Sequence, residues 1–264
     1  MKRFRTGKHH HNYTHPHKPR YVSLGTALPK TEFDGKIKVI TYNIKLSQNI
    51  RQALKLLAQH RELDNADIIC LQEMDYWGVK LIARVLKYNF VYYPAILHPR
   101  NDKDFGNAIL SKWPIINDQK IILPKLGTGN LQRIAVGATL LIDHTKVTVF
   151  CVHMKMFVRH HERRIPIDRI IEAIEPATKH CIIAGDFNTF SKSNCQAIMQ
   201  PLREADFRLA TDTIGWTYKH WYLFNKKSTL DHIFTRGMSV VDIGKVINHL
   251  PSDHIPIWGN LKLN

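Results

Sequence analysis

The chain has 264 residues, of which 44% are hydrophobic, and this is enough to bury the core of one large domain. It carries 38 Lys and Arg against 22 Asp and Glu, and the resulting net charge of +16 favours polyanionic partners such as nucleic acid or an anionic membrane surface. A basic composition that serves only solubility is the alternative. No apolar run reaches the roughly 18 residues that a membrane-spanning helix needs.

The cysteines and the N-terminus indicate which metal sites and which cellular compartment to expect. The four cysteines form no C-x-x-C pair, which argues against a zinc site and favours buried, reduced thiols. No apolar segment follows the basic N-terminus, so we expect no secretory signal and a cytoplasmic protein.

Residues 1–35 are expected to form a basic, histidine-rich tail. Residues 1–20 contain no acid and show no apolar periodicity, so we expect disorder at least as far as residue 20. The run His9-His10-His11 could bind a metal, but a solvated tail that adds non-specific attraction to a polyanion is the favoured interpretation. Residues 36–264 are expected to form a single catalytic domain.

From residue 36 onward, short apolar strands alternate with amphipathic helices. Helices are predicted at about 50–57, 76–88, a stretch that ends near 177, and about 192–200. Strands are predicted at 36–43, 67–74, 90–95, 105–111, 115–123, 134–142, 146–152, 181–185, 230–234, 240–246 and 255–263.

The stretch Ile182–Thr189 predicts a buried strand that stops at a tight turn. Asp186 and Asn188 are two residues apart, so in an extended conformation both side chains leave the strand on the same side. A carboxylate beside a carboxamide suits a site that handles a hard cation, an attacking water and a phosphate oxygen. Ordinary turn formers at a strand end are the alternative interpretation.

Other predicted strands also end in polar or ionisable residues. A core strand gains little from an ionisable end unless that end has a function, so the whole set predicts an assembled site. The residues are Asn43, Glu73, His153, Asp186, Asn188, Asp231, Asp253 and His254.

These segments together resemble the endonuclease/exonuclease/phosphatase superfamily, which includes the deoxyribonuclease I-like nucleases. The resemblance extends over about 36–263 and follows the family's order. It implies an α/β fold, a deoxyribonuclease I-like two-sheet sandwich of four layers, with divalent-metal phosphoester hydrolysis at one end. The matching segments are Thr-Tyr-Asn43, Leu-Gln-Glu73, Gly-Asn-Ala-Ile-Leu-Ser111, Val-His153, Gly-Asp186-Phe-Asn188-Thr, Leu-Asp231-His-Ile-Phe and Ser-Asp253-His254.

The resemblance also implies roles for the acidic and amide residues. Glu73 would be the main ligand of Mg²⁺, or of Mn²⁺ in its place, helped by Asn43 and by Asp253. Asp186 would orient or deprotonate the attacking water. Asn188 would hold that water or a phosphate oxygen.

The remaining roles fall on basic residues that would contact the phosphate. His254 would face the phosphate while Asp231 holds its other ring nitrogen and fixes its tautomer. His153 would donate a second hydrogen bond. Arg133 resembles a phosphate-contacting arginine of the family, although an ordinary surface charge is an equal alternative. His232 is predicted to point away from Asp231 if the strand is regular.

The shared motifs do not select the substrate. The first hypothesis is a Mg²⁺-dependent nuclease acting on DNA or RNA, because the charge is strongly basic and the segment 216–227 mixes aromatic residues with lysines. The alternative is a phospholipid or small-phosphoester hydrolase, for which basic and aromatic character would also suit an anionic lipid surface. A catalytically inactive nucleic-acid-binding module is a third hypothesis. We expect a monomer.

Overall fold

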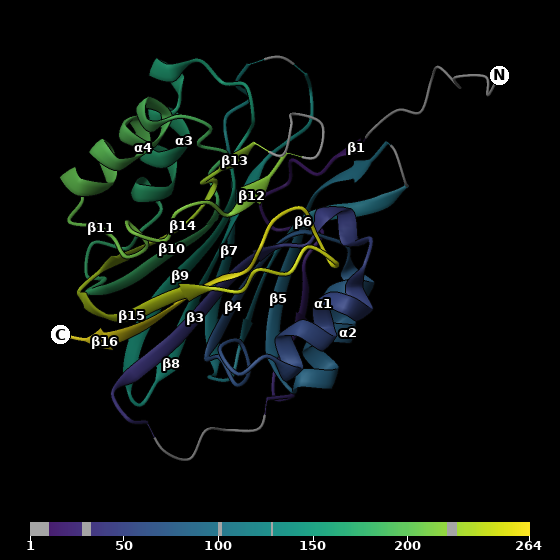
Figure 1. The fold of residues 1–264 in the computed structure, drawn as a ribbon, viewed down its shortest axis with the longest axis vertical. Helices are drawn as coiled ribbons and strands as arrows, with labels where there is room; N and C mark the ends of the chain where they lie inside the picture. The colour runs from purple at the N-terminus through teal and green to yellow at the C-terminus, as the bar shows by residue number, and fades with distance from the viewer. Residues whose placement is uncertain (1–10, 28–32, 100–101, 128, 221–225) are drawn as a thin grey trace.

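The computed structural model describes residues 11–27, 33–99, 102–127, 129–220 and 226–264. Two β-sheets face one another, and a pair of helices covers the outer face of each (Figure 1). The layers therefore run helix, sheet, sheet, helix. This is the four-layer α/β sandwich that the resemblance implied.

The first sheet contains eight strands and has the order β1-β5-β6-β4-β3-β16-β15, with β2 pairing beside β1 on β5. Its centre is the parallel pair β3–β4, in which Asn43 lies opposite Gln72. The strands are β1 (His11–Asn12), β2 (Tyr21–Ser23), β3 (Lys36–Asn43), β4 (Ile68–Met74), β5 (Asn89–His98), β6 (Lys103–Ser111), β15 (Met238–Lys245) and β16 (Ile257–Leu263).

The second sheet contains six strands and has the order β11-β14-β10-β9-β8-β7. The hairpin β8–β9 turns at Asp143 and His144, as predicted, and β9 then pairs in parallel with β10. The strands are β7 (Ile115–Ile122), β8 (Ile134–Ile142), β9 (Thr145–His153), β10 (His180–Asp186), β11 (Arg208–Leu209) and β14 (Asp231–Arg236), and a separate small pair is formed by β12 (Tyr218–Lys219) and β13 (Lys227–Ser228).

The hydrophobic residues divide into three cores that hold the layers together. One core lies between the two sheets, one between the first sheet and α1 and α2, and one between the second sheet and α3 and α4. The apolar spacing predicted for the first two helices supplies buried side chains of α1 and α2 to these contacts. The helices are α1 (Ile50–Gln59), α2 (Tyr76–Leu86), α3 (Arg164–Glu172) and α4 (Lys192–Glu204), with single 3₁₀ turns η1 (Lys45–Ser47) and η2 (His160–Glu162).

The predicted disorder of the N-terminal tail is wrong for residues 11–20. Strand β1 pairs with β5, so that His11 lies opposite Leu97. Arg20 forms a two-pronged ion pair with Asp118, with N···O distances of 2.8 and 2.6 Å. The polar composition hid these contacts, because backbone pairing and ion pairs need no apolar periodicity. Residues 1–10 lie outside the described part of the chain.

Within the described residues, no helix is both long enough and apolar enough to cross a bilayer. Of the predicted aromatic segment 216–227, residues 221–225 lie outside the description. The remainder forms the small β12–β13 pair, in which Tyr218 lies opposite Ser228.

Candidate active site

Strand register places three of the predicted side chains in one row, at the ends of three neighbouring strands of the second sheet. Asp186, the last residue of β10, lies opposite His153 on parallel β9 and opposite Asp231 on antiparallel β14. Residues opposite one another on neighbouring strands point to the same face, and here that face is the one turned toward the first sheet. His153 Nε2 lies 3.5 Å from Asp186 Oδ2.

The first sheet brings Asn43 and Glu73 to the same place. Asn43 ends β3, and its Nδ2 donates to Asp186 Oδ2 at 3.1 Å and toward Glu73 Oε1 at 3.3 Å. His153 Nε2 lies 3.9 Å from Glu73 Oε1. The fully buried amide of Asn43 therefore connects a carboxylate of one sheet to a carboxylate of the other.

His254 reaches the site from the loop before β16. Its Nδ1 lies 2.8 Å from Asp231 Oδ2, and its Nε2 lies 3.7 Å from Asp186 Oδ2. Ser252 holds the loop, because its hydroxyl donates to the Asn43 carbonyl at 2.8 Å and accepts from the His254 backbone N–H at 3.2 Å. The imidazole is thus fixed between two carboxylates.

Burial and neighbouring charges shift the titration of these groups in opposite directions. Burial raises the pKa of Asp186 to about 7, even though His254 acts to lower it. Burial alone would lower the pKa of His254, but the charges of Asp231 and Asp186 outweigh it and raise the pKa to about 10. The pKa of His153 falls well below its ordinary value, because the ring is buried and lies near Arg133 and His254.

Two site residues adopt the left-handed backbone region that side chains ordinarily avoid. Glu73 has φ 60° and Asn188 has φ 53°. The Leu46 N–H donates to Glu73 Oε2 at 3.0 Å, and the Asn188 N–H donates to Asp186 Oδ1 at 2.9 Å. Strained conformations of this kind persist where surrounding contacts fix them, and they cluster at functional sites.

Asn188 is held from several sides. Its Nδ2 donates to the Met154 carbonyl at 2.9 Å, and its own carbonyl accepts from Arg163 Nη1 at 3.1 Å. Just before it, Gly185 has φ 152°, and a Cβ there would lie 2.0 Å from the Val152 carbonyl oxygen. Only glycine allows β9 and β10 to approach so closely beside the site.

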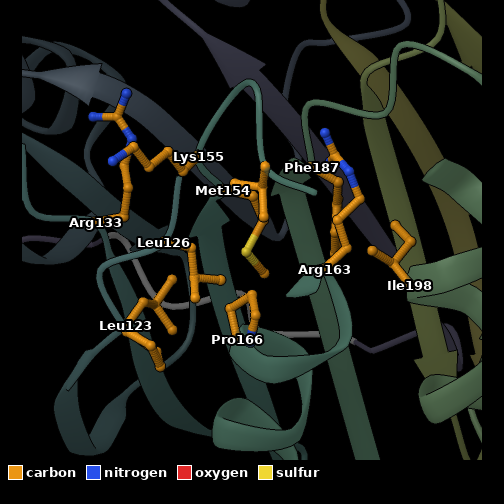
Figure 2. A pocket seen from close by; sticks show the side chains of 11 residues that line it. Leu123, Leu126, Arg133, Met154, Lys155, Arg163, Pro166, Phe187 and Ile198 are labelled. Atoms are coloured by element: carbon orange, nitrogen blue, oxygen red, sulfur yellow. The ribbon is translucent and has the colours of Figure 1, made fainter. Parts of the chain in front are cut away.

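Arg133 carries two buried nitrogen atoms without partners beside the site. Arg133 is half-buried, but its Nε and Nη1 atoms are buried without a partner, and its guanidinium lies 5.0 Å from the centre of the Phe105 ring. Burial lowers its pKa, although Glu73 and Asp186 act in the other direction. Figure 2 shows Arg133 and Arg163 on opposite sides of Met154 around a small, mainly apolar pocket next to the site. Arg133 thus lies partly buried near Glu73 and Asp186, and its role in binding phosphate stays a prediction.

The oxygen donors near Glu73 suit a hard divalent cation. Glu73 keeps 20% of its side chain exposed, and the predicted ligand Asp253 also offers carboxylate oxygens. The predicted ligand Asn43 turns its amide nitrogen toward Glu73, and its Oδ1 accepts from the Lys45 N–H at 3.1 Å. The Asp253 carboxylate forms an ion pair with Lys45 Nζ at 2.9 Å, so a negative charge at this point already attracts a cation. The donor set therefore fits Mg²⁺ or Mn²⁺ better than a soft metal.

Asp186, Asp231 and His254 form a second group whose ligand atoms all lie within 4.8 Å of one another. We interpret this trio as a histidine held by two carboxylates rather than a cation site. The reason is that His254 Nδ1 is already hydrogen-bonded to Asp231 at 2.8 Å, and an aspartate that accepts from a histidine ring nitrogen fixes the tautomer of that histidine.

The predicted site residues all lie at this edge of the sandwich, but some of their supports were not predicted. Lys45 and Arg163 gave no distinct signal, because each is one of several basic residues in its stretch. Thr217 accepts from the Asp231 backbone N–H at 3.1 Å and stands far from it in sequence.

His232 turns away from Asp231, as predicted. Its Nε2 lies 2.8 Å from Thr189 Oγ1, on the opposite side of β14 from the site. It is almost fully buried and takes no part in the group around Asp186.

Comparisons with known proteins show which family the chain belongs to. The model of the Endonuclease/Exonuclease/phosphatase family matches residues 40–254. A curated relative, a UPF0294 protein of Vibrio parahaemolyticus, is 27% identical over 146 residues, which cover 54% of this chain and 47% of the relative. The chain therefore aligns with about half the length of that relative.

Solved structures share the fold at low sequence identity. A family member from Leptotrichia buccalis has a TM-score of 0.69 at 17% identity, covering 86% of this chain and 100% of its own. Zebrafish TDP2, solved with a single-strand DNA product, has a TM-score of 0.70 at 17% identity, with coverage of 87% and 100%. A mannosyl-6-phosphatase of Bacteroides thetaiotaomicron has a TM-score of 0.64 at 18% identity, with coverage of 85% and 99%. With the family model matching most of its length, the chain belongs to the endonuclease/exonuclease/phosphatase family of phosphoesterases.

Proposed function

We propose that the protein is a divalent-cation-dependent phosphodiesterase that cleaves nucleic acid. The observation that carries this proposal is the continuous chain Asp231–His254–Asp186, which meets Glu73 and Asn43 at the junction of the two sheets. Such a chain combines a fixed imidazole, a buried carboxylate and a hard-cation ligand in one place. Together these groups can bind a phosphodiester, activate water and offset the developing negative charge.

Glu73, helped by Asn43 and Asp253, would hold Mg²⁺ in this proposal. When bound, the cation would polarise a phosphoryl oxygen and offset its developing negative charge. Lys45, which now pairs with Asp253 at 2.9 Å, would have to share that carboxylate.

The protein's own groups would bind the phosphate and move the proton. Asp186 would orient the attacking water and accept its proton, while Asn188 holds the water or a phosphate oxygen. His254 would donate from Nε2 to a phosphate oxygen, because Asp231 occupies its Nδ1 at 2.8 Å. His153 and the unpaired nitrogens of Arg133 would supply further hydrogen bonds to the same phosphate.

An aromatic series that leads outward from His254 favours nucleic acid over a small phosphoester. The ring centres of His254 and Tyr218 are 4.7 Å apart, and those of Tyr218 and His220 are 4.6 Å apart. His220 lies 5.7 Å from Phe190, which stacks on Phe157 at 6.1 Å with an angle of 3° between the rings. Phe157 is 77% exposed. Bases can stack on such surfaces whatever their sequence.

The basic residues around this series complement a phosphate backbone. Lys192 and Arg159 are exposed near its outer end, and Lys226 and Lys227 are exposed beside the β12–β13 pair. Cations placed along a row of aromatic rings suit a strand that presents bases on one side and phosphates on the other.

The proposal is tested by cleavage of supercoiled plasmid and of a labelled single-stranded oligonucleotide in Mg²⁺. We expect cleavage by the full chain, loss of cleavage in EDTA, and loss in Asp186→Asn with an unchanged circular dichroism spectrum. Asp212→Ala, which alters an exposed aspartate on the second sheet's side, serves as the matched control and should cleave normally. A folded wild-type protein that cleaves neither DNA nor RNA, yet releases phosphate or a headgroup from another phosphoester, would refute the nucleic-acid assignment.

A further inference from the structure

Helix α2 presents an apolar stripe to solvent on the face opposite its buried one. Val79, Ile82 and Ala83 point into the core beneath the first sheet. Trp77 and Val85, by contrast, are 71% and 52% exposed. The full stripe is Trp77, Leu81 and Val85, which follow one another at intervals of four residues and so lie along one side of the helix.

Basic residues flank this stripe and no acid interrupts it. Lys80 and Arg84 are exposed along α2, and Lys87 is exposed at its C-cap. Lys80 Nζ lies 5.3 Å from the centre of the Trp77 ring. Neither α2 nor the neighbouring α1 contains an acidic residue, so the outward side of this helix is made of large apolar and cationic groups.

The adjoining groove between α1 and α2 is more polar, because Ser47, Gln48, Asn49 and Gln52 also line it. Arg51 and Lys103 line it together with Trp77. Asp75 also lines it, but its carboxylate already accepts from the Gly78 N–H at 2.6 Å and pairs with Lys103 Nζ at 3.2 Å. Asp75 and Lys103 therefore offset one another, and Arg51 is the remaining positive charge in the groove lining.

We propose that this face of α2 docks the protein on an anionic lipid bilayer. Leu81 and Val85 gain nothing from phosphates or bases, but they gain free energy when they enter hydrocarbon. Trp77 suits the boundary between headgroups and acyl chains, and the flanking cations match anionic headgroups. In Figure 1, α2 lies beside α1 in the outer layer of the sandwich, where its outward side can meet a flat surface.

A nucleic acid or a protein fits this face less well. Nucleic acid would use the cations and leave the aliphatic residues exposed to water. A protein partner would need an apolar groove for the stripe and acidic edges for the flanking cations. An anionic bilayer supplies both the apolar environment and the negative charge at any position. The inference does not depend on catalysis, since none of these residues belongs to the group around Asp186.

Co-sedimentation of the full chain with vesicles tests the proposal. We expect binding to vesicles that contain phosphatidylglycerol, and weak binding to pure phosphatidylcholine. The double variant Trp77→Ser, Leu81→Ser should weaken binding by about tenfold or more, because two side chains lose their burial in the bilayer. Lys80→Gln, Arg84→Gln should reduce the preference for anionic lipid. These positions are exposed, so folding should be preserved, as a urea titration will verify.

Val241→Ser is the matched control, because Val241 is 49% exposed on β15, away from α2. It should bind like the wild type. Quenching of tryptophan fluorescence by brominated lipid supplies a second readout, which should occur in the wild type and fall in Trp77→Phe. Equal vesicle binding by the serine variant and the wild type would overturn the proposal. So would an absence of vesicle binding accompanied by weaker oligonucleotide binding in the same variant.

Discussion

Acidification is expected to destabilise the fold through His232, which is buried behind the candidate site. The Thr189 hydroxyl donates to the Thr229 carbonyl at 2.8 Å, so its oxygen must accept from His232 Nε2, and the ring proton resides on Nε2. Nδ1 is buried without a partner. A second proton would therefore place a charge and an unbonded N–H in the core, and burial lowers the pKa of His232 from 6.5 to about 4.

The size and direction of the effect follow from these two pKa values. Between them the unfolded chain binds a proton that the folded chain does not. The stability supplied by the neutral ring is therefore complete above pH 6.5 and is lost as the pH falls toward 4. Between pH 7.5 and 4.5 the loss amounts to about 2.5 kcal/mol. This is a large part of the roughly 5–15 kcal/mol that stabilises an ordinary domain.

Urea unfolding of the wild type and of His232→Gln at both pH values measures this loss. The glutamine amide retains a donor for Thr189 but does not titrate, so we expect its stability to fall by about 2.5 kcal/mol less than that of the wild type. Other titrating groups are common to both proteins and cancel in the comparison. His144→Gln, at an exposed hairpin turn, controls for loss of a histidine. An equal loss of stability in wild type and His232→Gln would refute the reasoning.

Three further substitutions probe the site. Asp231→Asn should lower kcat/KM by about 10²- to 10⁴-fold, because His254 loses the partner that fixes its tautomer. It should also lower the unfolding midpoint in urea, because the buried His254 loses its charged partner, so the kinetics are compared where circular dichroism shows both proteins folded. Steady-state kinetics within threefold of wild type would contradict this role. Arg133→Met should raise the free energy of unfolding in urea by about 1–2 kcal/mol, because it removes two unpaired buried nitrogens. It should also raise KM. A less stable variant would show that the guanidinium nitrogens have hydrogen-bond partners. Gly185→Ala should cost about 3 kcal/mol or more, since its Cβ meets the Val152 carbonyl; near-wild-type melting would rule out the close strand contact.

The identity of the site residues was predictable because their chemistry conflicts with their position. An ionisable group at the end of an apolar strand is costly, and several such conflicts in one chain indicated a common cause. The pairing between strands was less accessible. That His153 and Asp231 lie on either side of Asp186 depends on a parallel and an antiparallel neighbour, and no local pattern specifies which strands meet.

The supports of the site were the hardest part to predict. The hydrogen bond from Arg163 to the Asn188 carbonyl joins residues 25 positions apart, with helix α3 and strand β10 between them. Its sequence context, a run of basic residues, is typical of a solvated surface. The N-terminal segment misled for the opposite reason. Its polar side chains indicated a tail, whereas Tyr13 donates to Asp104 at 2.9 Å and Lys120 Nζ donates to the Tyr13 carbonyl at 2.7 Å.

The junction of the two sheets has a consequence for how the protein can be inhibited. Asn43 and Glu73 come from one sheet, and His153 and Asp186 from the other, so the working distances cross the sandwich interface. A slide of one sheet against the other by a single residue, about 3.3 Å, would separate these groups while leaving every strand intact. A small molecule that shifts one sheet against the other would therefore lower activity by separating these groups, without competing with the substrate.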